Sequence, residues 1–133
     1  MKPVFLDTVG LVALWDEDDQ WHDAATRAFD RLTAGRAPVV TTCYILAECG
    51  NAVARTDMRL EVDVLRARLE AAGCLVFPSD DDWRSAWDGY RRGLAAGAGL
   101  VDQLSFAVMR RLDLHDVFTN DRHFSAAGYH VLF

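Results

Sequence analysis

Four acidic residues are the strongest candidates for chemistry in this chain, because of the apolar segments that carry them. Asp7 directly follows a short apolar run at residues 4–6, and Asp121 follows a second apolar run by two residues. Glu48 and Asp102 lie in apolar segments with helical periodicity. Neither of these two has a lysine or arginine three or four residues away, so the usual helical ion pair is missing.

Carboxylates of this kind would do metal chemistry if they met in one pocket. Two carboxylates held about 4–5 Å apart repel each other by ~3–4 kcal/mol at an effective dielectric constant of about 20. Several such pairs stay together only when protons or divalent cations neutralise them. Oxygen ligands without histidine or cysteine suit Mg²⁺ or Mn²⁺. Each acid taken alone also has a simpler explanation, as a turn residue, a helix-terminal acid or a solvated surface group.

The expected strands and helices place these acids close together. Short apolar runs predict strands, and apolar residues every three or four positions predict helices. Strands are expected at 4–6, 39–41, 74–77 and 117–119, with an edge strand within 129–133. Helices are expected at 10–15, 20–33, 42–55, 59–72, 80–92 and 100–112. This alternation predicts an α/β fold, with a parallel β-sheet of four to five strands sandwiched between helices. Two of the acids then follow strand ends, where open α/β sheets bind their ligands.

The residues at the element ends predict how the helices start. Thr8 and Thr42 are expected to cap the helices that follow them. One acid of the run 16–19 is expected to cap the next helix in the same way. The run 93–99 is rich in glycine and alanine, which predicts a flexible connection before the apolar helix that begins at Leu100.

Length and composition suit one compact domain over residues 1–133. No apolar stretch is long enough to span a bilayer and no basic leader precedes one, so we expect a cytoplasmic protein with no membrane segment. The three cysteines are odd in number and form no CxxC pair, which argues against disulfides and a zinc site. The net charge of −6 argues against nucleic-acid binding, although carboxylates that hold metal ions produce the same imbalance.

The segments that carry the four acids also resemble the motifs of a known family, the PIN domains. The matching segments, which agree in order and spacing as well, are Phe5-Leu6-Asp7-Thr8, Ile45-Leu46-Ala47-Glu48, Leu100-Val101-Asp102 and Phe118-Thr119-Asn120-Asp121-Arg122-His123-Phe124. In length and single-domain form the chain is similar to VapC-type ribonuclease toxins of type II toxin–antitoxin systems. The resemblance spans nearly the whole chain. It implies the three-layer PIN fold and an endoribonuclease that depends on Mg²⁺ or Mn²⁺ and hydrolyses RNA phosphodiester bonds.

The resemblance also implies roles for individual residues. The catalytic site, which is also the metal site, would consist of the four matching acids, Asp7, Glu48, Asp102 and Asp121. Thr8, beside the first acid, would help to hold this site, and Thr119 is a candidate for a second supporting hydroxyl. Gln103 departs from the family pattern, in which a small residue usually follows the third acid.

The expected partners follow from the same resemblance. They are an RNA substrate, a cognate antitoxin protein and a second copy of the chain in a homodimer. The apolar helices around Leu11–Trp15 and Ala24–Phe29 are the expected groove for an amphipathic segment of the antitoxin.

Two other functions stay open as alternatives. One is a non-catalytic PIN-like module that holds RNA or protein without cutting. The other is a metal-dependent phosphatase or phosphotransferase, which is disfavoured because Val9 stands where such enzymes need a second aspartate and Lys2 is the only lysine. The four histidines show no metal-binding spacing and are expected to be structural or at the surface. Trp83 and Trp87, four residues apart, are expected in the core or in an interface.

Overall fold

A five-stranded parallel sheet lies at the centre of the computed structural model, which describes residues 1–133. The strands are β1 (Val4–Leu6), β2 (Val39–Thr42), β3 (Leu75–Val76), β4 (Asp116–Phe118) and β5 (His130–Val131). Their spatial order is β3-β2-β1-β4-β5, and each neighbouring pair is parallel. In the central strand, Phe5 pairs with Val40 on one side and with Val117 on the other. The edge strand expected near the C-terminus is therefore confirmed as β5.

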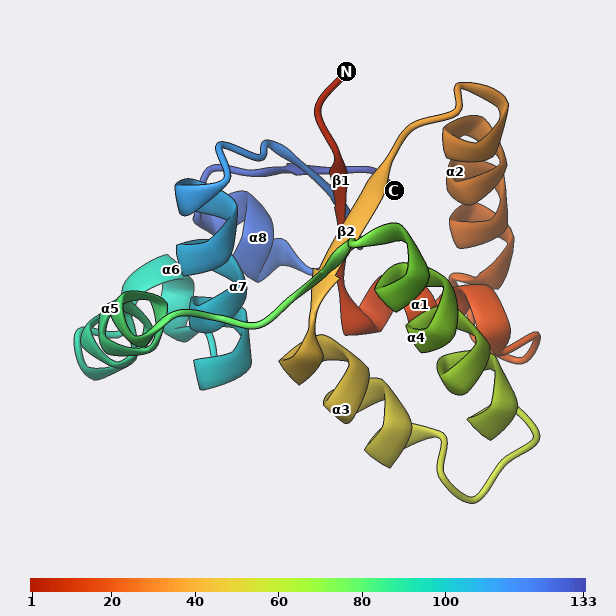
Figure 1. Cartoon of the computed structure of the whole chain (residues 1–133), viewed down its shortest axis with the longest axis horizontal. Helices are drawn as coiled ribbons and strands as arrows, with labels where there is room; N and C mark the ends of the chain where they lie inside the picture. Colours follow the sequence, from red (N-terminus) through yellow and green to blue (C-terminus); the bar gives the residue numbers. More distant parts are fainter.

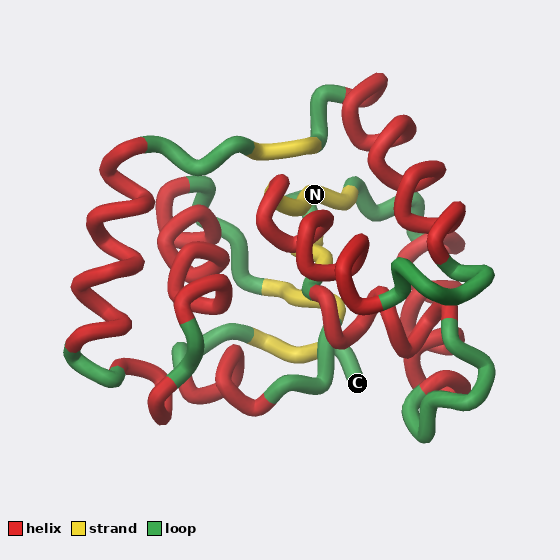
Figure 2. Tube along the Cα trace, turned by 90° about the horizontal axis from the view of Figure 1, so that it is seen from below, coloured by secondary structure: helices red, strands yellow, loops and turns green.

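Helices connect the strands and cover the sheet on both sides (Figure 1; Figure 2). They are α1 (Thr8–Trp15), α2 (His22–Ala34), α3 (Cys43–Ala52), α4 (Arg59–Ala72), α5 (Asp80–Arg91), α6 (Leu94–Gly97), α7 (Leu100–Arg111) and α8 (Arg122–Ala126). Helices α1 to α4 pack against one another, and α5 to α8 form a second group. This arrangement confirms the predicted three-layer α/β fold. None of the helices has both the length and the apolar character that crossing a bilayer requires.

The strand order creates a switch point beside β1. From β1 the chain builds outward through β2 to β3, and it then crosses to the other side of β1 to form β4 and β5. At such a point the connections after β1 and β4 leave in opposite directions and open a crevice at the carboxyl ends of the strands. Asp7 directly follows β1 and Thr119 directly follows β4, so both lie at this crevice.

Aromatic packing in the core holds α7 against α8, the two helices near whose first turns the later acids lie. Phe106 on α7 and Phe124 on α8 are both almost fully buried, and their rings meet edge to face with centroids 5.0 Å apart. Such a pair adds about 0.5–1.5 kcal/mol to the gain from burial alone. Because Asp102 lies one helical turn before Phe106, and Asp121 precedes the five-residue α8, this contact sets the distance between the two acids.

Several helix ends differ from the expectations, while others agree with them. Thr42 caps α3 as expected, because its Oγ1 accepts a hydrogen bond from the backbone N–H of Ile45. Thr8 was expected to cap the first helix, but the helix begins at Thr8 and Asp7 is the capping position. No acid of the run 16–19 caps α2, whose capping residue is Trp21. Helix α8 was not predicted, because five residues are too few to show helical periodicity.

The run 93–99 is a defined turn instead of the flexible connection that was expected. Ala95 and Ala96 both have positive φ, as do Gly93 before α6 and Gly97 at its end. A left-handed alanine costs about 1–2 kcal/mol, so another contact must hold the turn. The buried side chain of Gln103 does so, because its Nε2 donates hydrogen bonds to the carbonyls of Leu94 at 2.9 Å and Ala98 at 3.4 Å. The unusual residue after Asp102 therefore has a structural role.

Candidate active site

Asp7 is a buried carboxylate at the carboxyl end of β1. Its side chain is 2% exposed and does not cap α1, although Asp7 holds the capping position. Instead, its Oδ2 accepts a hydrogen bond of 2.8 Å from Thr119 Oγ1. Burial, together with the nearby charges of Asp102 and Asp121, raises the pKa of Asp7 to about 7 despite this hydrogen bond. The folded protein thus holds Asp7 where its negative charge is costly.

Gly10 explains how β1 and β4 can deliver their functional residues to the same place. A Cβ atom at Gly10 would lie 2.1 Å from the carbonyl oxygen of Phe118, the last residue of β4. No side chain fits there, so the first turn of α1 rests directly on the end of β4. The backbone N–H of Asp7 also donates to this carbonyl, at 3.4 Å. As a result, the side chains of Asp7 and Thr119 face one another.

Glu48 reaches the site from α3 and is held there by Thr8. The hydroxyl of Thr8 donates a hydrogen bond of 2.6 Å to Glu48 Oε1. Both side chains are half-buried, and they join residues that lie 40 positions apart in the sequence. A hydrogen bond to a charged group contributes about 1.5–3 kcal/mol. Thr8 therefore supports Glu48, whereas Thr119 supports Asp7.

Asp102 lies in the first turn of α7 and faces the other acids. Burial, followed by the negative charges of Asp121 and Glu48, raises its pKa to about 6. The charge of His123 works in the opposite direction. Since each of these groups must be near Asp102 to act on it, the raised pKa connects residues of α3, α7 and α8 to one site.

Asp121 caps α8 and lies beside Thr119 and His123. Its Oδ1 accepts a hydrogen bond of 2.9 Å from the backbone N–H of His123 and lies 2.8 Å from the ring Nδ1 of the same residue. The backbone N–H of Asp121 donates to Thr119 Oγ1 at 3.1 Å. The hydroxyl of Thr119 therefore accepts from Asp121 and donates to Asp7, and it holds the two acids in one arrangement.

Two of the four acids, Asp102 and Asp121, lie close enough to share a divalent cation, and Asp7 and Glu48 lie near them. Donor atoms of Asp102, Asp121 and His123 all lie within 4.8 Å of one another. Of the four acids, Asp121 alone pairs with a basic side chain, that of His123. No lysine or arginine pairs with any of them. A hard divalent ion would neutralise crowded carboxylates such as Asp7 and Asp102, whose pKa values are raised. The structure thus brings together all four acids that the sequence analysis selected, with both supporting threonines.

His123 is the residue that the sequence analysis missed. It was grouped with the other histidines as structural or at the surface, yet its half-buried ring lies against Asp121 inside the acid cluster. The available signal was its place two residues after Asp121, within the turn that leads into α8. Trp83 and Trp87 are each 41% exposed, so their expected place in the core is wrong, and the interface remains as the explanation.

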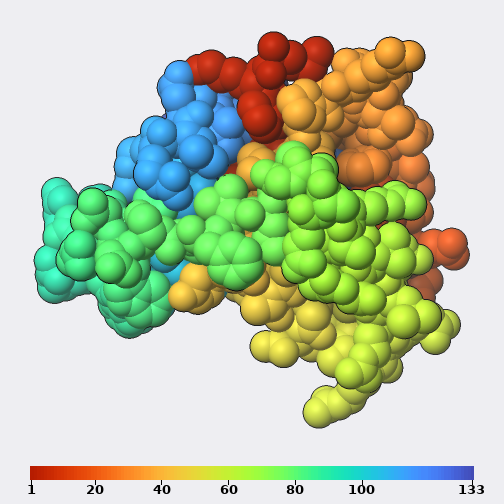
Figure 3. All heavy atoms as spheres, viewed as in Figure 1, coloured from red at the N-terminus to blue at the C-terminus, as the bar shows by residue number.

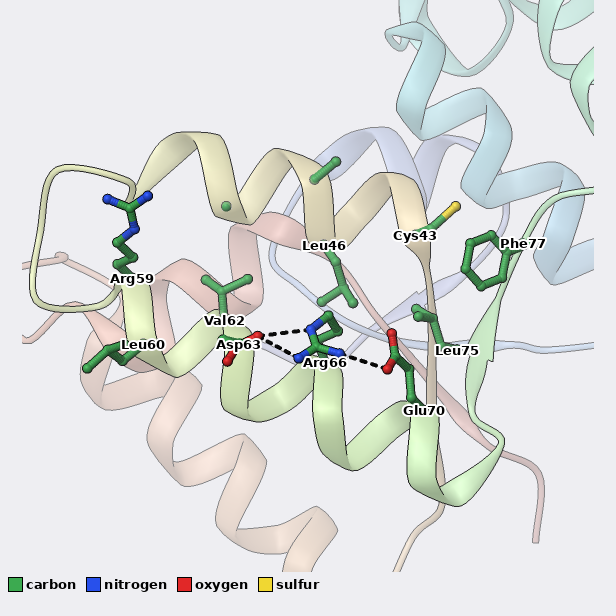
Figure 4. A pocket seen from close by; sticks show the side chains of 12 residues that line it. Cys43, Leu46, Arg59, Leu60, Val62, Asp63, Arg66, Glu70, Leu75 and Phe77 are labelled. Carbon is green, nitrogen blue, oxygen red and sulfur yellow. Dashed lines mark hydrogen bonds and ion pairs between the residues drawn. The ribbon is translucent and has the colours of Figure 1, made fainter.

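The large cavity in Figure 4 does not contain these acids. It has a volume of about 660 Å³ and lies between α3 and α4, with Leu46 and Phe77 among its lining residues. Arg66, which also lines it, is paired with Asp63 and Glu70 on the same helix, as the dashed lines show. Since Glu48 instead turns toward Thr8 on α1, the α3 helix separates this cavity from the acid cluster.

Comparisons with known proteins find similarity over nearly the whole chain. Residues 4–128 match the family model described as PIN domain. The 23S rRNA-specific endonuclease VapC20 of Mycobacterium tuberculosis, found in two strains, is 31% identical to this chain over 128 residues, which is 95% of each protein. The crystal structure of VapC20 from Mycobacterium tuberculosis, described as a Sarcin-Ricin loop cleaving toxin, superposes on this chain with a TM-score of 0.77. The two chains are 28% identical, and the match covers 96% of each.

Two more distant structures share the fold alone. FitAcB from Neisseria gonorrhoeae has a TM-score of 0.65 at 20% identity and covers 98% of this chain and 96% of its own. FitAB bound to an IR36 DNA fragment has a TM-score of 0.64 at 20% identity, with coverage of 96% and 92%.

Proposed function

This chain belongs to the PIN domain family and is a homologue of VapC-type endonucleases, and on this premise we propose that it is an endoribonuclease that depends on Mg²⁺ or Mn²⁺. We propose further that residues 1–133 act as one PIN domain and that the protein is the toxin of a toxin–antitoxin pair. The observation that carries the proposal is the convergence of Asp7, Glu48, Asp102 and Asp121, with no arginine or lysine to neutralise them.

Asp7 and Asp102 are the proposed principal metal-holding residues, with Glu48 and Asp121 completing the site. A divalent cation bound there supplies positive charge to the acid cluster and to the phosphate that reacts. The hydrogen bond from Thr119 fixes the carboxylate of Asp7 and engages one of its two oxygens. The cation binds the deprotonated carboxylates, and its charge offsets the cost of ionising them.

Glu48 is the proposed residue for orienting the attacking water. Its Oε1 is occupied by the hydrogen bond from Thr8, which leaves Oε2 free to accept a proton from water. An in-line attack on phosphorus needs the water held on the side opposite the leaving oxygen, and a carboxylate fixed by a second residue can hold it there. Thr8 is a positioning residue in this scheme, because it acts through Glu48.

The proposed substrate is RNA, and ribosomal RNA is the first class to test. The relative from Mycobacterium tuberculosis is named for cleavage of 23S rRNA, and its structure is named for cleavage of the Sarcin-Ricin loop. The similarity to this relative covers nearly the whole of both chains, so it includes every element that carries an acid.

Cleavage of purified ribosomal RNA and of a hairpin with the Sarcin-Ricin sequence tests this proposal. We expect cut ends in the presence of Mg²⁺ or Mn²⁺, and no cutting with a chelator. The variants Asp7→Asn and Asp102→Asn should lower the rate by a factor of about 10²–10³, as expected for groups that stabilise developing charge. Asp18→Asn, at an exposed position away from the cluster, is the matched control. Intact RNA after long incubation with either ion would refute the assignment.

The non-catalytic module is the main alternative. It predicts that the protein binds RNA with the same affinity in the wild type and in Asp102→Asn, and that neither cuts. The presence of all four acids in one cluster favours the nuclease, because a module that only binds RNA has no use for crowded negative charge near phosphates.

The antitoxin is proposed to dock in a groove between α1, α2 and α4. A cavity of about 130 Å³ there is lined mostly by apolar side chains, among them Leu11, Trp15 and Phe29. It continues into a second hollow of about 630 Å³ with Asp16, Glu17, Asp57 and Glu61 around it. An apolar floor with an acidic rim suits an amphipathic segment that carries lysine or arginine.

Co-expression with the small protein encoded beside this gene tests the groove. Val64 lines the groove and is 47% exposed, so Val64→Glu should weaken the complex strongly. Leu60→Glu, one turn earlier on α4 and outside the groove, is the matched control and should leave the complex intact. Equal co-purification of both variants with the partner would place the antitoxin elsewhere.

A second copy of the chain is proposed to cover a strip of exposed aromatic residues. The strip runs from Tyr44 on α3 to Trp83, Trp87 and Tyr90 on α5, and adjacent ring centroids lie 6.1, 5.9 and 5.4 Å apart. Helix α5 projects from one side of the molecule (Figure 3), and all four side chains are exposed. Tryptophan and tyrosine dominate the central part of protein–protein interfaces.

The charges beside the strip favour a protein over RNA as its occupant. Arg84, Arg91 and Arg92 each pair with an aspartate on the same helix, so little unpaired positive charge is left for phosphates. Light scattering after size-exclusion chromatography tests the dimer: Trp87→Glu should be monomeric, and Leu60→Glu should match the wild type. A wild-type chain that is monomeric at high concentration would exclude the homodimer.

A further inference from the structure

We propose that His123 is a direct nitrogen ligand of the divalent ion and that Asp121 orients its ring. This inference rests on the proposed metal site and names a ligand that the four-acid set does not contain. It starts from the cluster in which donor atoms of Asp102, Asp121 and His123 lie within 4.8 Å of one another. That separation is short enough for one ion to contact donors from both α7 and α8.

The hydrogen bond to Asp121 fixes the state of the imidazole. The ring Nδ1 lies 2.8 Å from Asp121 Oδ1, and an ionised carboxylate can only accept a hydrogen bond. Nδ1 is therefore the donor, and in the neutral ring the lone pair is on Nε2. Histidines that bind metal ions commonly donate their other N–H to a carboxylate in this way, which fixes the tautomer and the ring orientation.

The cap of α8 does not by itself explain the ring contact. Asp121 Oδ1 already accepts the backbone N–H of His123, so the helix end is satisfied without the imidazole. His123 is also half-buried, whereas an ion pair made only for the surface would leave its ring in solvent. His130 provides the comparison, since its Nδ1 lies 2.9 Å from Asp116 Oδ1 but both side chains are mostly exposed and lie outside the cluster.

A nitrogen ligand changes which cation the site prefers. Carboxylate and water ligands alone suit Mg²⁺ and Mn²⁺ alike, whereas imidazole favours first-row transition metals. The chain should therefore bind Mn²⁺ more tightly than Mg²⁺, and His123 should account for a large part of the difference. Loss of this ligand in His123→Gln should weaken Mn²⁺ binding by about tenfold while changing Mg²⁺ binding much less.

Pulsed electron paramagnetic resonance of the Mn²⁺-loaded protein tests this ligand without reference to activity. The wild type should show a modulation from directly coordinated nitrogen-14, and incorporation of nitrogen-15 histidine should change it. The modulation should be lost in His123→Gln and retained in the matched variant His130→Gln. Isotope labelling of the wild type shows whether any histidine coordinates the ion, and the two variants assign the signal to His123 or to another histidine.

The outcomes separate this inference from the proposed function. Bound Mn²⁺ with RNA cleavage but no histidine nitrogen coupling would overturn the role of His123 and leave the nuclease in place. Equal Mn²⁺ affinity in the wild type and in His123→Gln would overturn it as well. A wild-type protein that binds neither Mn²⁺ nor Mg²⁺ would overturn both this inference and the proposed metal site.

Discussion

Replacing Asp7 with asparagine should make the metal-free protein more stable at alkaline pH, although it removes a residue of the active site. Because the folded-state pKa of Asp7 is about 7 and its ordinary value is 3.8, the folded protein retains a proton between about pH 4 and 7 that the unfolded chain has lost. The free energy of unfolding therefore falls as pH rises through this window. Asp7→Asn removes the ionisation and with it this loss of stability.

The expected gain follows from the size of the pKa difference. A rise from 3.8 to about 7 corresponds to ~4 kcal/mol once Asp7 is fully ionised. Asparagine keeps an oxygen that accepts the hydrogen bond from Thr119, but it also buries an amide N–H₂ group at a cost of about 1–3 kcal/mol. The net gain above pH 7 is then ~2 kcal/mol, or a rise of roughly 5–10 °C in melting temperature.

Thermal unfolding in the presence of a chelator, at about pH 8 and about pH 5, measures the effect. At the alkaline pH the variant should melt above the wild type. At the acidic pH Asp7 is already protonated, so the variant should melt at the same temperature or lower. Asp18→Asn, which is exposed and outside the cluster, should show no such reversal.

Divalent ions should reverse the order at alkaline pH. Mn²⁺ at 100 times its dissociation constant should stabilise the wild type by ~2.7 kcal/mol, whereas Asp7→Asn should gain little. A variant that is destabilised equally at both pH values would show that burial does not raise the pKa of Asp7 as described. Equal stabilisation of both proteins by Mn²⁺ would show that Asp7 is not part of the metal site.

Two further substitutions test how the site is held. Gly10→Ala should lower the free energy of unfolding by ~2–3 kcal/mol in a denaturant titration, because the added Cβ would meet the carbonyl oxygen of Phe118. Gly50→Ala is the control: Gly50 lies in a helix with open space around it, so this change should raise the free energy of unfolding by ~0.5–1 kcal/mol. Thr8→Val should slow RNA cleavage about tenfold by freeing Glu48 while changing stability by ~1 kcal/mol or less, and Thr8→Ser should restore the rate; equal rates in both variants would exclude the positioning role.

The secondary structure could largely be predicted from local sequence patterns. The central strand is three consecutive buried residues, and the expected helix at 59–72 coincides with α4. Local chemistry also predicted the cap at Thr42, because a threonine before an apolar helix accepts the N–H three residues later. Patterns failed where elements were short or unusual, as in α8 and in the left-handed turn held by Gln103.

The sequence alone predicted the chemical class of the site, because four acids in apolar segments without cationic partners, if they meet, can be tolerated together only with protons or metal ions. Which groups touch one another was decided by the tertiary structure. The hydrogen bond from Thr119 to Asp7 joins residues 112 positions apart, and the one from Thr8 to Glu48 joins residues 40 positions apart. No local sequence pattern predicts such pairs. The same holds for His123, whose ring gains its place only when Phe106 and Phe124 pack and bring α7 and α8 together.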